Sequence, residues 1–200
     1  MRYVLCVLVF AFAAGATFAE GNGRQPSTFI DSLTYVEAFG VTGWHLLAKD
    51  PASREEGRRM CDAIIISGLL TEGLKNLTNQ SRPAPYEYDK KGFPSGHASL
   101  AFSVAAALSA QEPSATWIAF PLAAADAWAR EDIGRHTWAQ VLAGAALGTW
   151  VGRLAGQGKL RIFGHKDAAP VARVPGVAEL DNPSHAVGPA NQLAVWGVSF

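Results

Sequence analysis

The sequence predicts an all-α protein, a bundle of helices followed by a short β or irregular C-terminal tail. Apolar residues recur at helical spacing through most of the chain, and no stretch before residue 160 alternates as a strand does. The connections between the expected helices are short, which favours antiparallel neighbours. A length of 200 residues suits one domain, and a hydrophobic fraction of 49% is ample for its core.

The first nineteen residues are predicted to be a signal peptide. Arg2 supplies the charged start, Tyr3 to Ala14 the apolar core, and Thr17 to Ala19 a small-x-small cleavage site. We therefore expect an exported protein in a bacterial periplasm. The alternative is a membrane anchor that is retained, with the functional site on the outer side, because Tyr3 to Ala19 is at the short limit of a spanning helix.

Residues 20–27 are predicted to be a polar linker, and residues 28–161 the helical domain. The first helix of that domain is expected from Phe29 to Ala48. Pro51 opens the second, with Ser53 as the candidate N-cap and Glu56 three residues on, and this helix should run toward Lys75. After a loop over 81–96, further helices are expected at about 97–110, 114–129 and 137–155. Residues 162–200 form the tail.

Small residues in the last of these helices predict close packing. Gly144 and Gly148 form a small-xxx-small pair, a spacing that lets two helices approach closely in a membrane or in a soluble core. Within the helical domain the longest run without a charged residue covers only 136–152, and a span normally needs about twenty apolar residues. We therefore favour a soluble or membrane-associated bundle over a polytopic protein.

The segment Pro94 to His97 stands directly before an alanine-rich helix and predicts an anion site. A helix N-terminus presents unpaired N–H groups and the positive end of the helix dipole. Gly96 lets the backbone approach a ligand closely, Ser95 adds a hydroxyl, and His97 adds a group that titrates near neutrality.

Cations that suit such an anion occur on both sides of this segment. Lys75 and Arg82 are seven residues apart, almost two helical turns, so they share one face if the segment is helical. Downstream, Arg130 precedes His136 by six residues. A guanidinium binds phosphate oxygens in a fork-like manner, and an ammonium adds a point charge. Arg135 competes with Arg130 for this role.

These three blocks resemble the signature of one superfamily, which reads K-x6-RP, then PSGH, then SR-x5-H-x3-D. It is the type 2 phosphatidic acid phosphatase superfamily, which includes lipid phosphatases, bacterial class A acid phosphatases and vanadium haloperoxidases. The matching blocks here are Lys75 to Pro83, Pro94 to His97, and Arg130 to His136. The resemblance implies a helical bundle of the acid phosphatase and vanadium haloperoxidase type.

The same resemblance implies a role for each matching residue in a phosphatase without a metal ion or other cofactor. His136 would be the nucleophile that forms a phosphohistidine, and His97 the general acid and base. The remaining residues would bind phosphate: Lys75, Arg82, Ser95, Gly96 and Arg130. In agreement with this, the sequence contains no HExxH, CxxC or Walker-type motif.

Two positions depart from the family pattern. Ala129 stands where the family has Ser, and Gln140 stands where it has the Asp that orients the nucleophilic histidine. The oxygen of Gln140 can still accept a hydrogen bond from the imidazole, but it supplies no negative charge. We therefore expect a less basic His136 and slower chemistry, unless Glu131 or Asp132 takes the place of the missing carboxylate.

The expected substrate is a phosphorylated small molecule or a lipid phosphate, the latter met at a membrane surface. A formal net charge of zero gives no basic excess for nucleic acid. Two other functions fit the same residues. A vanadate-dependent haloperoxidase would use the same pocket, and Gln140 is also compatible with a degenerate site that binds phosphate or phospholipid with weakened catalysis.

Overall fold

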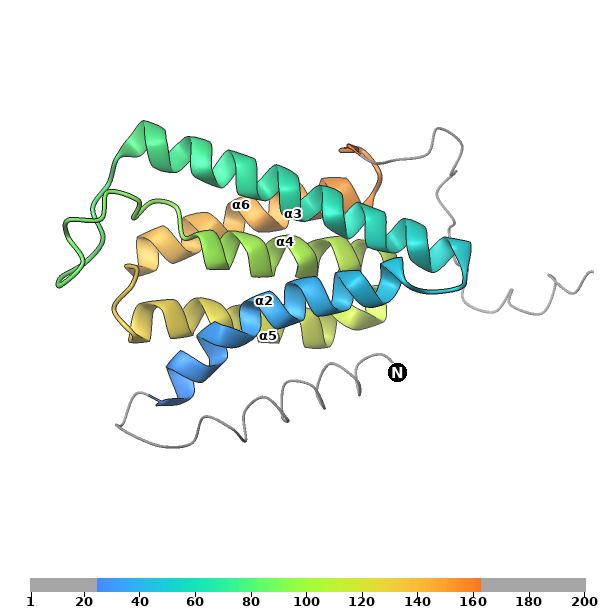
Figure 1. Ribbon diagram of the computed structural model, residues 1–200, viewed down its shortest axis with the longest axis horizontal. Helices are drawn as coiled ribbons and strands as arrows, with labels where there is room; N and C mark the ends of the chain where they lie inside the picture. The colour runs from blue at the N-terminus through green and yellow to red at the C-terminus, as the bar shows by residue number, and fades with distance from the viewer. Residues whose placement is uncertain (1–24, 163–200) are drawn as a thin grey trace, which may run out of the picture. The chain divides into compact units, whose positions relative to one another are not determined.

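A computed structural model of the chain describes residues 25–162 (Figure 1). The elements of this part of the chain, in order, are α2 (Gln25–Leu46), α3 (Pro51–Thr78), α4 (Gly96–Gln111), the 3-10 turn η1 (Pro113–Ala115), α5 (Thr116–Asp132) and α6 (Trp138–Gly156). The range 25–162 contains no strand, so the all-α prediction is confirmed. The predicted signal peptide lies outside the described residues, as does the predicted tail from residue 163 onward.

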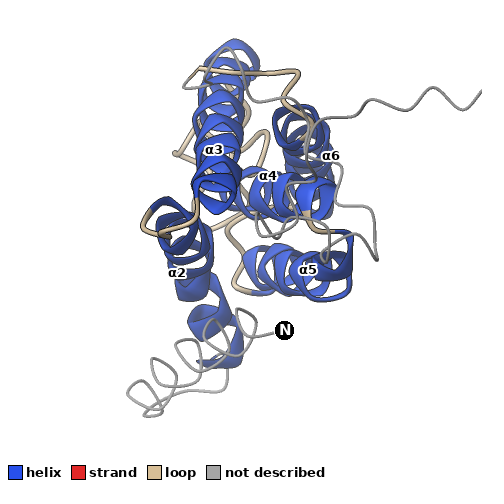
Figure 2. Ribbon diagram, turned by 90° about the vertical axis from the view of Figure 1, so that its right-hand side faces the viewer, coloured by secondary structure: helices blue, strands red, loops and turns tan. Residues whose placement is uncertain are grey.

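Helix α4 lies in the middle of the bundle, with α2, α3, α5 and α6 around it (Figure 2). Its central position follows from its short side chains, which let neighbouring helices approach from several sides. The buried residues of the three hydrophobic clusters include many alanines, among them Ala98, Ala101, Ala105, Ala107, Ala123, Ala127 and Ala155. Met60 is the largest of the fully buried side chains.

Helices α4 and α6 contact each other through backbone atoms along a repeat of four residues. A Cβ placed on Gly144 would lie 2.4 Å from the backbone oxygen of Ser95, and one on Gly148 would lie 2.3 Å from that of Ser99. The same relation recurs at Gly152 and Gly156, which face Ser103 and Ala107. We call these four glycines the glycine ladder. Only glycine fits at such an approach, because any side chain would meet main-chain atoms that cannot move independently.

Helix α3 has its N-cap three residues before the predicted one, and it ends three residues after Lys75. Asp50, and not Ser53, is the N-cap, and its carboxylate accepts hydrogen bonds from the backbone N–H and the hydroxyl of Ser53. The reason is that Pro51 suits the first helical position and has no N–H to satisfy. The helix continues past Lys75 to Thr78, where Asn79 ends it in a left-handed conformation.

Helix α2 begins at Gln25, so residues 25–27 of the predicted linker are helical. Pro26 is compatible with this start, since proline is tolerated in the first turn of a helix. Two polar contacts attach α2 to its neighbours. The hydroxyl of Thr34 donates to the buried carboxylate of Asp126 in α5, and His45 lies 3.2 Å from Glu56 in α3.

Between residues 25 and 162, no helix combines the length and the apolar character that crossing a bilayer would require.

Candidate active site

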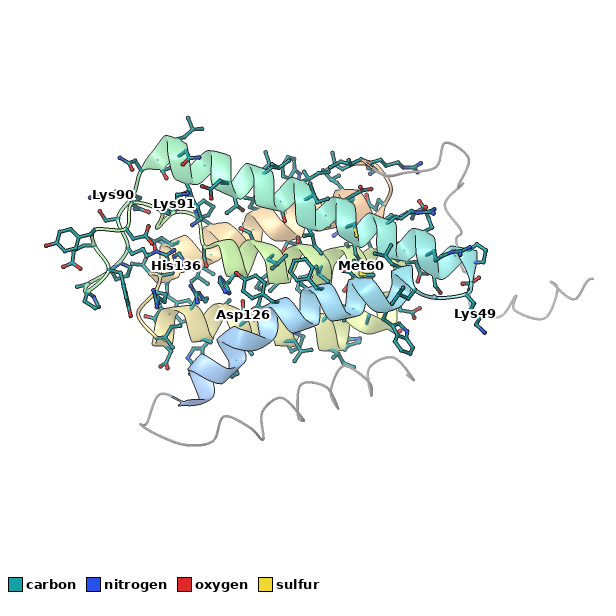
Figure 3. The ribbon with its side chains drawn as sticks, in the orientation of Figure 1. Lys49, Met60, Lys90, Lys91, Asp126 and His136 are labelled. Carbon is teal, nitrogen blue, oxygen red and sulfur yellow. The ribbon has the colours of Figure 1, made fainter. Side chains whose placement is uncertain are left out.

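The candidate site lies at the end of the bundle that carries the loop between α3 and α4. His136 lies at the same end of the bundle as Lys90 and Lys91 of that loop (Figure 3). His136 follows the end of α5, where its backbone N–H and that of Arg135 both donate to the carbonyl of Arg130, at 3.1 Å each. Thr137, the next residue, is the N-cap of α6. This tight turn between two helices places the imidazole in a buried position, with only 2% of the residue exposed.

Two oxygen atoms face Nδ1 of the His136 ring. The backbone oxygen of Gly92 lies 2.9 Å from it, and Oε1 of Gln140 lies 3.0 Å from it. A carbonyl oxygen can only accept a hydrogen bond, so Nδ1 carries the proton and donates. Neither Glu131 nor Asp132 takes the place of the missing carboxylate at this nitrogen.

The other ring nitrogen, Nε2, lies 3.1 Å from Nη1 of Arg82. A guanidinium can only donate, so this contact also requires Nε2 to carry its lone pair. Burial, and next the positive charge of Arg82, lower the pKa of His136 to about 3. The hydrogen bond to Gln140 acts in the opposite direction and does not overcome them. At neutral pH, His136 is therefore an uncharged imidazole with its free lone pair on Nε2.

Arg82 is held by the loop that follows it. Its Nε lies 2.6 Å from a carboxylate oxygen of Asp89, and its backbone N–H donates to the backbone oxygen of the same residue. The backbone N–H of Lys91 donates to the Asp89 carboxylate, and this bond, together with the nearby Arg82, lowers the pKa of Asp89. The ionised Asp89 fixes one edge of the guanidinium, and Nη1 then reaches both Nε2 of His136 and the backbone oxygen of Arg135.

Lys75 is buried at the same end of α3, with its ammonium 2.6 Å from the backbone oxygen of Lys91. Burial, followed by the charge of Arg82, lowers its pKa to about 8. The side chain also reaches the start of α4, since a Cβ placed on Gly96 would lie 3.8 Å from its Cε. Arg82 is thus close enough to Lys75 to lower its pKa, next to the segment that precedes α4.

Ser95 is the N-cap of α4, but its hydroxyl makes no capping bond. The residue is fully buried, and within the described part of the chain Oγ has no hydrogen-bond partner. Its backbone N–H donates to the backbone oxygen of Gln140 at 2.9 Å, which ties the start of α4 to the first turn of α6. The first N–H groups of α4 and a buried hydroxyl are thereby placed near His136.

His97 occupies the first turn of α4 and is half-buried. Its ring packs edge-to-face against Tyr35 of α2, with 5.0 Å between the ring centroids. This contact gives the imidazole a defined orientation at the start of α4.

The two candidate arginines after α4 differ in placement. Arg130 is buried in the last turn of α5 and is one of the charges that lower the pKa of His136. Arg135 is exposed, and its guanidinium lies 4.1 Å from the ring centroid of Tyr86, a cation–π contact. Of the two arginines, Arg130 is thus the one whose charge acts on His136, whereas Arg135 packs on the loop.

The structure thus brings the sequence-predicted residues to one end of the bundle, and it adds groups that the sequence did not indicate. Gly92 contacts His136, and Asp89 contacts Arg82. Both residues lie in the loop between α3 and α4, where the sequence contains no motif that would indicate them. The contact of Gly92 uses a backbone oxygen, which any residue type possesses, so its identity carried no signal.

Gln140 has two roles in the structure. It is the N3 residue of a capping box with Thr137, and its Oε1 accepts both from the Thr137 N–H, at 3.2 Å, and from His136.

Within residues 25–162 no group of His, Cys, Asp and Glu side chains could hold a metal ion.

Comparison with known proteins adds two findings. The family model of the PAP2 superfamily matches residues 57–158. The crystal structure of Aquifex aeolicus LpxE is similar to this chain, with a TM-score of 0.56 and 26% sequence identity over 64% of this chain and 82% of that chain. No curated protein matches the chain.

Proposed function

The chain belongs to the PAP2 superfamily, and from that premise we propose that it hydrolyses a lipid phosphate through a phosphohistidine on His136. The superfamily match, together with the similarity to LpxE, supports a phosphoric monoester hydrolase. The single observation that carries the proposed route is the set of contacts around the His136 ring. Two carbonyl oxygens lie beside Nδ1, which places the proton on that nitrogen, and Nη1 of Arg82 lies 3.1 Å from Nε2, the nitrogen that keeps its lone pair.

In the first step the Nε2 lone pair of His136 attacks phosphorus, and the bond from phosphorus to the ester oxygen breaks. His97, in its protonated form, gives its proton to the leaving oxygen, and an alcohol departs. The phosphorylated ring keeps its Nδ1 proton and is cationic. The oxygens of Gly92 and Gln140 stabilise this charge through the same two hydrogen bonds.

In the second step His97 takes a proton from water, whose oxygen attacks phosphorus. The phosphorus–nitrogen bond breaks, the electron pair returns to Nε2 of His136, and inorganic phosphate is released. Lys75, Arg82 and Arg130 supply the positive charge that a metal ion supplies in other phosphatases, so we propose that the reaction needs no metal. The hydroxyl of Ser95 and the N–H groups of α4 add donors.

Exposed apolar side chains near the site support a lipid substrate. Leu77 at the end of α3 is 83% exposed, Tyr88 in the loop 93%, and Trp138 at the start of α6 47%. The exposed Lys90 and Lys91 lie in the same loop. Apolar and aromatic groups beside cations suit an anionic lipid surface.

We further propose that the protein is exported and meets its substrate at the outer side of a membrane, as the signal-like residues 1–19 indicate.

A trapping experiment tests the route. The His97→Ala protein, incubated with phosphatidic acid labelled with ³²P, should accumulate an acid-labile, base-stable phosphohistidine, and His136→Ala should form none. Labelling of His97→Ala at another residue, or full turnover by His136→Ala, would overturn the proposal.

A substrate comparison tests the lipid class. Phosphatidic acid in mixed micelles should be hydrolysed faster than glycerol 3-phosphate at equal phosphate concentration, and an equal rate would contradict a lipid preference.

The two other functions that the sequence left open have their own readouts. Bromide oxidation that depends on added vanadate would indicate a haloperoxidase, and phosphate binding without hydrolysis would indicate a degenerate site.

A further inference from the structure

The hydrogen bonds around Gln140 link the nucleophile to a segment of the K-x6-RP motif that has no assigned role. Nε2 of Gln140 donates to the backbone oxygen of Ser81 at 3.0 Å, and it lies 3.3 Å from Oε1 of Gln80. These two residues stand directly before Arg82. The amide of Gln140 therefore lies between the segment 80–81 on one side and His136 on the other.

The orientation of this amide is determined by main-chain atoms. Its nitrogen faces the Ser81 carbonyl, which only accepts, and its oxygen faces the Thr137 N–H, which only donates. A flipped amide would place oxygen against oxygen at Ser81 and N–H against N–H at Thr137. The oxygen of Gln140 is thus directed to Nδ1 of His136.

Gly92 completes the arrangement. Its backbone N–H donates to the carbonyl of Gln80 at 2.8 Å, and its own carbonyl accepts from His136. A Cβ on Gly92 would lie 2.4 Å from the backbone oxygen of Ser81 and 2.7 Å from Nε2 of Gln140. Only glycine fits between these groups, so a side chain here would separate the segment 80–81 from Gln140.

We propose that the Gly92 carbonyl and the segment 80–81 are positioning groups for the nucleophile. The segment orients the Gln140 amide, and the amide and the Gly92 carbonyl together hold the proton on Nδ1 of His136. Two neutral acceptors thereby do what one carboxylate does in the family pattern, namely fix the tautomer. They add no negative charge, so the ring is oriented without becoming strongly basic. This inference rests on the proposed function only in taking His136 as the nucleophile.

The test is a ¹⁵N NMR measurement of the imidazole nitrogens of His136 in the full-length protein at pH 7, made together with steady-state kinetics. The wild type should show a protonated Nδ1 and an unprotonated Nε2. Gln140→Leu and Gly92→Ala should each move both ¹⁵N shifts toward the average of the two tautomers. Each should also lower kcat by about tenfold or more, with a much smaller change in KM. Gly73→Ala is the matched control, since nothing lies within 4 Å of its added Cβ.

Two results would overturn the inference. One is an Nε2-protonated His136 in the wild type, a measurement that needs no variant to fold. Another is a folded Gln140→Leu or Gly92→Ala protein that keeps both the pure Nδ1–H tautomer and the wild-type kcat. Failure of the proposed function is distinguishable. If the tautomer responds as expected while His97→Ala forms no phosphohistidine, the positioning groups are supported and the covalent route is not.

Discussion

Nη1 of Arg82 lies 3.1 Å from Nε2 of His136, the atom that we propose attacks phosphorus. In the proposed reaction both groups act on the same phosphate, yet here they contact each other. We therefore expect the arginine to exchange the imidazole for phosphate oxygens when the substrate enters, which frees the Nε2 lone pair. The contact of Nε with Asp89, at 2.6 Å, should limit how far the guanidinium moves.

Arg82→Lys tests this exchange. An ammonium is a single point charge and cannot hold Asp89 while it presents two N–H groups to a phosphate. We expect kcat/KM to fall by about 10²- to 10³-fold, as for the loss of a donor to a transition-state oxyanion. Phosphate release from phosphatidic acid measures it. Arg58→Lys, in an ion pair with Glu55 away from the site, is the control and should keep the wild-type value. An unchanged kcat/KM in Arg82→Lys would contradict the role.

The lowered pKa of Lys75 predicts a loss of activity in mild alkali. Its pKa of about 8 means that the ammonium of the free enzyme loses its proton, and with it the attraction for phosphate, as the pH rises through that value. kcat/KM, which reports the free enzyme, should therefore decline above about pH 8.

Lys75→Arg provides the comparison, because a guanidinium stays charged far above this range. Its kcat/KM should be lower at pH 7 but should show no decline between pH 8 and 10. If the decline persists unchanged in Lys75→Arg, another group is responsible for it.

His136 predicts a pH dependence of stability. Its pKa is about 3 in the folded protein, against 6.5 for an ordinary histidine. Below pH 6.5 the unfolded chain binds a proton that the folded protein excludes, so stability falls as the pH decreases from 6.5 toward 3. The loss is at most about 1.4 kcal/mol per pH unit.

Urea unfolding at pH 7, 6, 5 and 4 measures this effect. The His136→Gln protein lacks the titrating group, so its free energy of unfolding should fall less steeply than that of the wild type over this range. If the free energy of unfolding falls equally steeply with decreasing pH in the two proteins, the folded protein does not disfavour protonation of His136.

The glycine ladder predicts opposite effects for two chemically identical substitutions. Gly148→Ala places a methyl group 2.3 Å from the backbone oxygen of Ser99, and we expect it to destabilise the fold by about 1–3 kcal/mol. Gly68→Ala in α3 meets nothing within 4 Å, and removing a glycine from a helix interior should stabilise by about 0.5–1 kcal/mol. Thermal unfolding distinguishes the two, and a Gly148→Ala protein as stable as the wild type would argue against the close approach.

Helical periodicity and the absence of an alternating pattern predicted the all-α fold, because these signals are local. The candidate residues Lys75, Arg82, Arg130 and His136 could be named because charged and titratable side chains in three blocks resemble a family signature. The structure places them at one end of the bundle, and their roles in the reaction stay predictions.

What escaped prediction depends on main-chain atoms and on tertiary register. The carbonyls of Ser81 and Gly92 act on Gln140 and His136, but every residue has a carbonyl, so the sequence cannot mark which one is used. The sequence shows Gly144 and Gly148 as a pair, but their partners on α4 follow from how two helices are aligned. Ser53 and Glu56 resemble a capping box and so predict an N-cap at Ser53, whereas Pro51 favours Asp50.

The glycine ladder also sets where the two histidines that we propose to be catalytic stand, since His97 belongs to α4 and His136 directly precedes α6. Their separation is governed by four contacts spread over the length of both helices, the farthest being Gly156 with Ala107. Enlarging that remote glycine would tilt one helix against the other and misalign proton donor and nucleophile without touching either. Inactivating substitutions in this enzyme should therefore occur at the opposite end of the bundle as well as beside the phosphate.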